Sequence, residues 1–240
     1  MVLSVLAEVL YEQGDLAQTA QLLEEGLQLS KDLAEPHHSV MILGTLAKLL
    51  HKMGDTDGSM EVARQGLQLA ERIGDKPRVA GMMDVMATVE EDQGHLEEAT
   101  RHWELSLQIL TELDDRYEVA QLLRNLARIQ RKLGRFMEAL RLYEESLKIA
   151  RTLGDTRGTA ETLLLLGSLR QDQGKDYEAL RSYASAWLLL HQLRSPSTQL
   201  ALTGMKIIRA KLGDEQFQTW LKEYPAEETH ELLRALDTAS

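Results

Sequence analysis

The 240-residue chain carries 38 acidic and 27 basic side chains, which gives a net charge of −11 at pH 7. This surplus of negative charge argues against a general nucleic-acid binder, because phosphate contacts need a basic surface. The chain has no cysteine, which excludes disulfides, thiolate metal sites and a cysteine nucleophile. Apolar residues make up 43% of the chain, yet no apolar run approaches the roughly 20 residues that cross a bilayer. Since no secretory signal is visible either, we expect a cytoplasmic protein that does not span a membrane.

Glycine recurs at a fixed interval along the chain, which is typical of a repeat array. The series consists of Gly14, Gly54, Gly94, Gly134 and Gly174, spaced forty positions apart, and Gly213 falls one position short of the next place. On both sides of Gly134, apolar residues lie three and four apart, as one face of a helix requires. Each unit is therefore predicted to be a helix, a tight glycine turn and a second, antiparallel helix.

Small residues also repeat at fixed places, which predicts where helices approach one another closely. In the first helix of each unit the small residues are Ala7, Ala47, Ala87, Ala127 and Gly167. In the second helix they are Thr19, Ser59, Ala99, Ala139 and Ala179. The positions beside them hold larger apolar residues, such as Leu126 and Leu147, which we assign to the core.

The ends of the predicted helices follow the same period. Gly74 and Gly154 are expected to take a left-handed turn at a helix C-terminus, and Asp75, Asp115 and Asp155 are expected to cap the next helix. We predict five repeats over residues 1–195 and a degenerate sixth repeat with a capping helix over 196–240. The last helices are expected at 200–212, 214–224 and 227–236.

The predicted first helix is about one turn shorter than its counterparts. The sequence ahead of Gly14 starts at Met1, whereas the helix ahead of Gly54 is expected to start as far back as Pro36. No capping element lies ahead of this shorter helix. We therefore expect Met1 to begin an excised fragment of a longer protein.

These repeated positions resemble the tetratricopeptide repeat, with small residues in both helices and glycine in the turn between them. The units here are longer than the usual unit of that family, and in this they are similar to the long repeats of kinesin light chains and of bacterial signalling ATPases and transcription regulators. The resemblance implies an all-α fold, a right-handed superhelical solenoid of antiparallel helix pairs. It also implies that the first helices line a concave groove, in which a partner peptide or helix docks.

The sequence contains no convincing catalytic or metal-binding constellation. It lacks a G-x-S-x-G elbow, an H-E-x-x-H motif and a phosphate-binding loop. His95 and His102 are seven positions apart and share a predicted helical face, but no set of ligands at metal spacing accompanies them. We expect a protein without enzymatic activity, cofactor or bound metal.

Charge is unevenly distributed between neighbouring repeats. Residues 76–113 hold three basic and eight acidic side chains, whereas 114–153 hold nine basic and six acidic ones. Arg124, Arg128 and Arg131 lie at i, i+4 and i+7, so they share one helical face, with Gln121 and Asn125 beside them. Because leucines and isoleucine take the apolar face of this helix, the arginines are expected to point away from the core.

The resemblance places Arg124 and Arg128 on the groove, where the arginine fork suits a carboxylate. The alternative is that these arginines pair with acidic side chains of the neighbouring repeat, such as Asp84 and Asp92. We expect the pair Arg124→Glu and Arg128→Glu to leave thermal unfolding nearly unchanged and to abolish partner capture. The predicted partner-binding residues are Gln121, Arg124, Asn125, Arg128 and Arg131, with Lys48, Asp84 and Ser168 at corresponding positions of other repeats.

We therefore predict an interaction scaffold that binds an acidic or mixed-charge segment of another protein, or another domain of its parent chain. Its leading form is the sensor or regulatory section of a larger signalling protein. Two alternatives stay open: self-association through the uncapped N-terminal helix, which would give a homo-oligomer, and regulation of an enzyme domain missing from the fragment.

Overall fold

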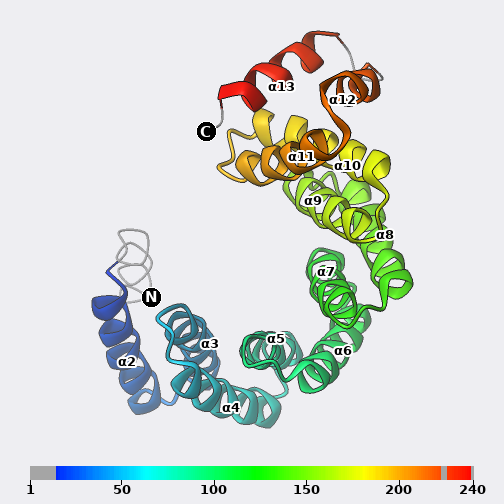
Figure 1. Ribbon diagram of the computed structural model, residues 1–240. Helices are drawn as coiled ribbons and strands as arrows, with labels where there is room; N and C mark the ends of the chain where they lie inside the picture. Colours follow the sequence, from blue (N-terminus) through cyan, green and yellow to red (C-terminus); the bar gives the residue numbers. More distant parts are fainter. Residues whose placement is uncertain (1–14, 223–225, 239–240) are drawn as a thin grey trace. The chain divides into compact units, whose positions relative to one another are not determined.

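The computed structural model describes residues 15–222 and 226–238, and within these ranges all regular structure is helical (Figure 1). The helices are α2 Leu16–Asp32, α3 Pro36–Lys52, α4 Thr56–Ile73, α5 Lys76–Asp92, α6 Leu96–Glu112, α7 Arg116–Lys132, α8 Phe136–Leu153, α9 Thr156–Asp172, α10 Asp176–Gln192, α11 Thr198–Leu212, α12 Asp214–Leu221 and α13 Ala226–Thr238. The predicted all-α fold of packed helix pairs is confirmed. The predictions for Gly14, Ala7 and the first helix around them lie outside the described residues.

The turn inside each repeat has the left-handed conformation that its glycine permits. The φ angles of Gly54, Gly94, Gly134 and Gly174 lie between 71° and 86°. The amide that follows each of these glycines donates back to the carbonyl five positions earlier, as Asp55 N does to Leu50 O at 2.9 Å. The chain therefore reverses within a short turn, and each helix packs against the next.

The turns between repeats match their predicted capping. Gly74 and Gly154 are left-handed, with φ of 71° and 68°. Asp75 and Asp155 then accept hydrogen bonds from backbone amides of the following first turn, at 3.2 and 2.9 Å. The same place in three other turns holds a non-glycine residue that is also left-handed: Ala34, Asp114 and Arg194.

The small residues lie where helices touch. Thr19, Ser59, Ala99, Ala139 and Ala179 are all at most 2% exposed. The Ser59 hydroxyl donates to the Ala47 carbonyl at 2.8 Å, which joins α4 directly to the small-residue position of α3. Close approach at these positions fixes how each helix of a pair lies on the other.

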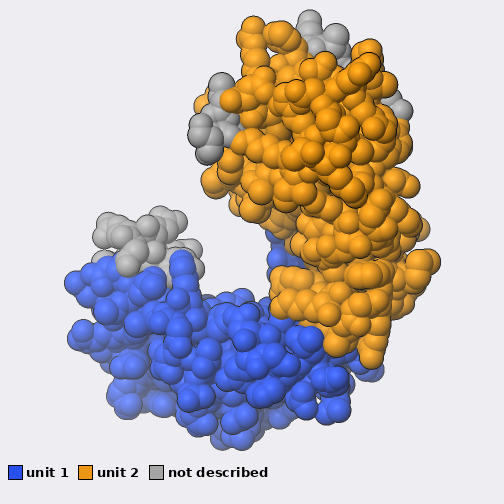
Figure 2. Space-filling model, in the orientation of Figure 1, with its two compact units in different colours: residues 1–122 blue, residues 123–240 orange. Residues whose placement is uncertain are grey.

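The chain divides into two compact units, residues 1–122 and 123–240 (Figure 2). In the first unit, each helix from α2 to α5 packs against the next, and α3 also contacts α5. In the second unit, α8 to α11 pack in succession, α9 contacts α11, and α12 and α13 pack on α11. The division falls within α7, so it does not follow the repeat boundaries.

Candidate protein-interaction surface

Arg124, the first of the predicted binding arginines, is buried rather than exposed. Arg124 as a whole residue is 9% exposed, and its Nη2 donates a hydrogen bond of 3.3 Å to Glu161 Oε2 of α9. Its Nη1 is buried and has no hydrogen-bond partner among the described residues. The expectation that Arg124 points away from the core was wrong, because the side chain lies in the contact between successive first helices of the second unit.

Arg131 is likewise engaged with the next repeat. Its Nε donates to Asp172 Oδ2 at the end of α9, and this hydrogen bond raises the pKa of Arg131 above its ordinary value. The arginines thus pair with carboxylates of the following repeat, rather than with Asp84 and Asp92 of the preceding one. Arg128, Gln121 and Asn125 are half-buried on the same helix.

Asp84 and Ser168, two more predicted binding residues, hold second helices in place. Asp84 Oδ1 accepts a hydrogen bond of 2.8 Å from the indole of Trp103, which is fully buried. The Ser168 hydroxyl lies 3.1 Å from the Tyr183 hydroxyl, which also donates to Gln171 Oε1 at 2.9 Å. Trp103 and Tyr183 occupy the same place in their repeats, so this place serves to anchor an aromatic side chain to the first helix.

Lys48 lies in a different setting, at a groove between the first helices α3 and α5. The groove has a volume of about 100 Å³, and we call it the α3–α5 groove. Its lining consists of Met41, Gly44, Thr45 and Lys48 from α3, and Pro77, Arg78, Gly81 and Met82 from α5. Lys48 and Arg78 are both exposed.

The groove is hollow because small residues stand where other repeats carry large ones. Gly44 corresponds to Asp84 and Arg124 in the later repeats, and Ala63 corresponds to Trp103. The hydrogen bond between aspartate and indole therefore has no counterpart here. Instead the methyl group of Met82 reaches this place, and a Cβ added to Gly44 would lie 3.1 Å from it.

The two cations of the α3–α5 groove differ from the α7 arginines in their surroundings. Neither Lys48 nor the Arg78 guanidinium forms an ion pair with a residue in the described ranges. Asp75 Oδ1 accepts a hydrogen bond of 3.2 Å from the backbone amide of Arg78. The other carboxylate oxygen, Asp75 Oδ2, lies 3.2 Å from His37 Nδ1 of α3. The groove therefore presents positive charge, and more of its exposed lining is polar than apolar.

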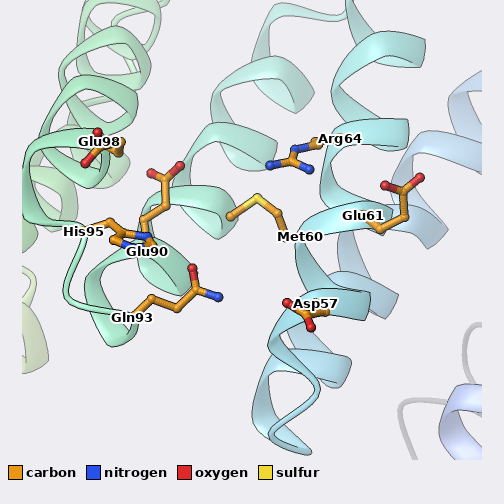
Figure 3. Close-up of a pocket in the computed structure, with 8 residues that line it drawn as sticks. All are labelled: Asp57, Met60, Glu61, Arg64, Glu90, Gln93, His95 and Glu98. Carbon is orange, nitrogen blue, oxygen red and sulfur yellow. The ribbon is translucent and has the colours of Figure 1, made fainter.

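A second hollow of about 550 Å³ lies beside α4 in the same unit, and we call it the α4–α6 hollow (Figure 3). One side is formed by Asp57, Met60, Glu61 and Arg64 of α4, and the other by Glu90, Gln93, His95 and Glu98 of α5, α6 and the turn between them. Glu90 is 8% exposed, and its Oε2 lies 2.7 Å from His102 Nδ1. The hollow is polar and acidic, unlike the mainly apolar sites that hold small molecules.

The described residues include no group of three or more histidines and carboxylates that could hold a metal ion. Among the helices that are described, none has the length and apolar character needed to cross a membrane.

Of the residues that line the α3–α5 groove, Lys48 was among the predicted partner-binding residues, whereas Arg78 and the two glycines were not predicted. The charge count for residues 76–113 gave a strongly acidic repeat, which concealed one exposed arginine at its start. A comparison of aligned positions could have found the groove, since Gly44 and Ala63 are smaller than the residues at the same places in the later repeats.

Comparisons with known proteins agree with the fold. A family model described as a tetratricopeptide repeat matches residues 78–152 and 118–187, and a second model with the same description matches residues 1–39. No curated protein sequence matches the chain.

Solved structures resemble the chain at low sequence identity. BtubC (BKLC) from P. vanneervenii has a TM-score of 0.75 and 20% identity, over 93% of this chain and 92% of that one. A signal transduction ATPase with numerous domains and a tetratricopeptide repeat sensor, from Pyrococcus horikoshii, has a TM-score of 0.76 and 17% identity, over 97% of this chain and 37% of that one. A Rap protein complexed with competence and sporulation factor has a TM-score of 0.71 and 14% identity, over 97% of this chain and 70% of that one. The helix pairs, the turn glycines and the matching models together place the chain in the tetratricopeptide repeat family.

Proposed function

We propose that this chain is a non-catalytic interaction module, which binds an acidic segment of another protein in the α3–α5 groove. The observation that carries the proposal is the pair of exposed cations, Lys48 of α3 and Arg78 of α5, at the same groove. Neither side chain forms an ion pair with a described residue, whereas Arg124 pairs with Glu161 and Arg131 pairs with Asp172.

The lining of the groove suits a short peptide. An acidic side chain accepts hydrogen bonds from the planar Arg78 guanidinium and from the Lys48 ammonium. Met41 and Pro77 offer apolar contact to the residue beside it. Because Gly44 and Gly81 have no side chain, the ligand backbone can approach the helices closely.

On α7, the half-buried Gln121, Asn125 and Arg128 are proposed as further polar contacts. Their neighbour Arg124 acts as a structural residue in this proposal, because Glu161 already satisfies part of its guanidinium. The fold and its likeness to a tetratricopeptide repeat sensor support a role as the sensor or regulatory section of a larger cytoplasmic signalling protein.

A selection from a displayed library of random 12-residue peptides tests the proposal. The wild-type chain is expected to enrich peptides rich in aspartate and glutamate, and the variant Lys48→Glu with Arg78→Glu is expected to lose them. The control variant, Arg72→Glu with Arg101→Glu, makes the same change of net charge at exposed residues of second helices and is expected to keep them. Enrichment of the same peptides by all three proteins, or of none by the wild type, contradicts the proposed site.

A further inference from the structure

Helix α11 exposes two large apolar side chains on one face. Leu200 is 63% exposed and Ile207 is 54% exposed, and they are seven positions apart, or about two helical turns. Thr203 and Ala210, which are also exposed, lie on the same face. We call these four residues the α11 face. A single exposed leucine is ordinary, whereas two large apolar groups on one face of a helix mark an apolar strip along it.

The opposite side of α11 is fully used by the core of the second unit. Ala201, Leu202, Met205 and Ile208 are at most 5% exposed and belong to its hydrophobic cluster. Helices α12 and α13 contribute Phe217, Leu221, Leu232 and Leu236 to the same cluster. The apolar residues of the α11 face are therefore additional to those that the fold needs.

The charge of α11 indicates what kind of helix fits this face. The helix contains Lys206, Arg209 and Lys211 and no acidic residue. Arg209 forms ion pairs with Asp214 and Asp237, and Lys211 forms one with Asp176. Lys206 forms no ion pair with a described residue. Lys206 lies one position before Ile207 and is half-buried, so its charge borders the apolar strip.

A second copy of the chain fits this face poorly. Packing α11 against α11 of another copy across a two-fold axis brings Lys206 of both copies into one interface without a carboxylate from α11, since Arg209 and Lys211 are already paired and the helix has no acidic residue. An anionic membrane is disfavoured because it needs a cluster of cations, and Lys206 is the one cation of α11 that has no ion pair with a described residue. An acidic helix complements both the strip and its lysine.

We infer that the α11 face docks an amphipathic helix of a partner protein, with apolar residues at i, i+3 or i+4 and i+7 and with acidic residues along one edge. Such a helix covers Leu200 and Ile207 with its apolar side and places a carboxylate near Lys206. The inference shares with the proposed function the premise that the chain binds other proteins, but it uses a different unit and a helical rather than an extended ligand.

The test uses the full chain and a displayed library of 18-residue helix-forming peptides built from leucine, alanine, glutamate and lysine. The wild type is expected to enrich peptides with leucine at helical spacing and an excess of glutamate. The variant Leu200→Ser with Ile207→Ser should bind the enriched peptides at least tenfold more weakly, and Lys206→Glu should shift the selection away from glutamate. A matched control, Leu105→Ser with Met137→Ser, removes two exposed apolar side chains of second helices and should leave binding unchanged.

Several results would overturn the inference. These are failure to enrich any helical peptide, equal binding by the α11 variants and the wild type, or enrichment of lysine-rich helices. Two further contrary results are a concentration-dependent dimer that Leu200→Ser with Ile207→Ser abolishes, and binding to vesicles of equimolar phosphatidylserine and phosphatidylcholine that depends on Lys206 while no peptide binds. The α3–α5 variant Lys48→Glu with Arg78→Glu should keep the helical peptides, so failure at one site is distinguishable from failure at the other.

Discussion

At the scale of single residues, the pair of Arg124 and Glu161 shows how a charged side chain becomes part of the packing. The Arg124 side chain is 11% exposed and that of Glu161 is 44% exposed. A buried charge that loses its partner is costly, whereas the same pair on a surface contributes little. The partial exposure of Glu161 places this pair between those limits.

We predict that Glu161→Ala lowers the free energy of unfolding by about 1–3 kcal/mol, because Arg124 then lacks its carboxylate partner. Arg124→Glu should destabilise at least as much, since it places a carboxylate beside Glu161. This replaces the expectation that the double arginine variant leaves thermal unfolding unchanged. Urea denaturation measures both effects. As a control, Arg124→Met with Glu161→Met removes both charges and should recover most of the loss, so an equally unstable double variant argues against the pairing.

The left-handed turns between repeats give a second prediction at this scale. Ala34, Asp114 and Arg194 have φ of 55°, 54° and 51°, where a Cβ is unfavourable. Replacing each with glycine should raise the free energy of unfolding by about 0.5–1 kcal/mol, the net of relieved strain and the greater freedom of glycine in the unfolded chain. The opposite exchange, Gly74→Ala, should destabilise by about 1 kcal/mol. Lower urea midpoints for the glycine variants would contradict the assigned turn conformation.

At the scale of helices, the ring of Tyr183 occupies the space between α9 and α11. A Cβ added to Gly167 would lie 2.7 Å from this ring, and one added to Gly204 would lie 2.5 Å from it. The two glycines therefore let an aromatic side chain of α10 contact both neighbouring helices at once, and Tyr183 itself is 4% exposed.

Gly167→Ala and Gly204→Ala should each destabilise the second unit by about 1–3 kcal/mol, because a closely packed ring cannot move aside freely. The variant Tyr183→Leu makes room, so Gly204→Ala should cost much less in that background. Thermal unfolding of the wild type, Gly204→Ala, Tyr183→Leu and the double variant forms a double-mutant cycle. Additive effects of the two substitutions would show that the ring and the glycine do not contact one another.

Because the Tyr183 hydroxyl is buried, we predict that the protein loses stability in alkaline solution. Burial raises the pKa of Tyr183 above its ordinary value of 10.0, although the hydrogen bond with Ser168 opposes the shift. The unfolded chain then releases this proton at a lower pH than the folded chain, so the stability present below pH 10.0 is lost as the pH rises through the folded value. Tyr183→Phe should flatten this part of the pH profile of unfolding. A profile identical to that of the wild type above pH 10.0 would contradict the burial of the hydroxyl.

The helices and their turns could be predicted from the sequence because they depend on local patterns. Glycine, aspartate and apolar residues at one repeated interval specify where each helix ends, and the structure places Gly74 and Asp75 as expected. The burial of Arg124 and its ion pair with Glu161 could not be predicted in this way. Its burial depends on which side chain of α9 faces it, and that register is set by the packing of one repeat on the next.

At the scale of the whole molecule, the repeats are alike in fold and different in surface chemistry. The α3–α5 groove offers two available cations, whereas the corresponding helix α7 has Arg124 and Arg131 in ion pairs. The sequence predicted a repeat scaffold, and the structure shifts the best candidate for acidic-ligand binding from α7 to α3 and α5. An array built from one unit can therefore carry distinct binding sites, because residues outside the recurring packing positions are free to differ.

The central claim is tested most directly by exchanging charge between the groove and its ligand. The measurement is the dissociation constant of the best acidic peptide from the 12-residue selection, and of its analogue with lysine at each acidic position, for the wild type and for Lys48→Glu with Arg78→Glu. The account predicts that the groove variant binds the acidic peptide at least about tenfold more weakly, equivalent to about 1.4 kcal/mol, and that it gains affinity for the lysine analogue. If the variant binds both peptides as the wild type does, the acidic ligand docks elsewhere and the groove is not its site.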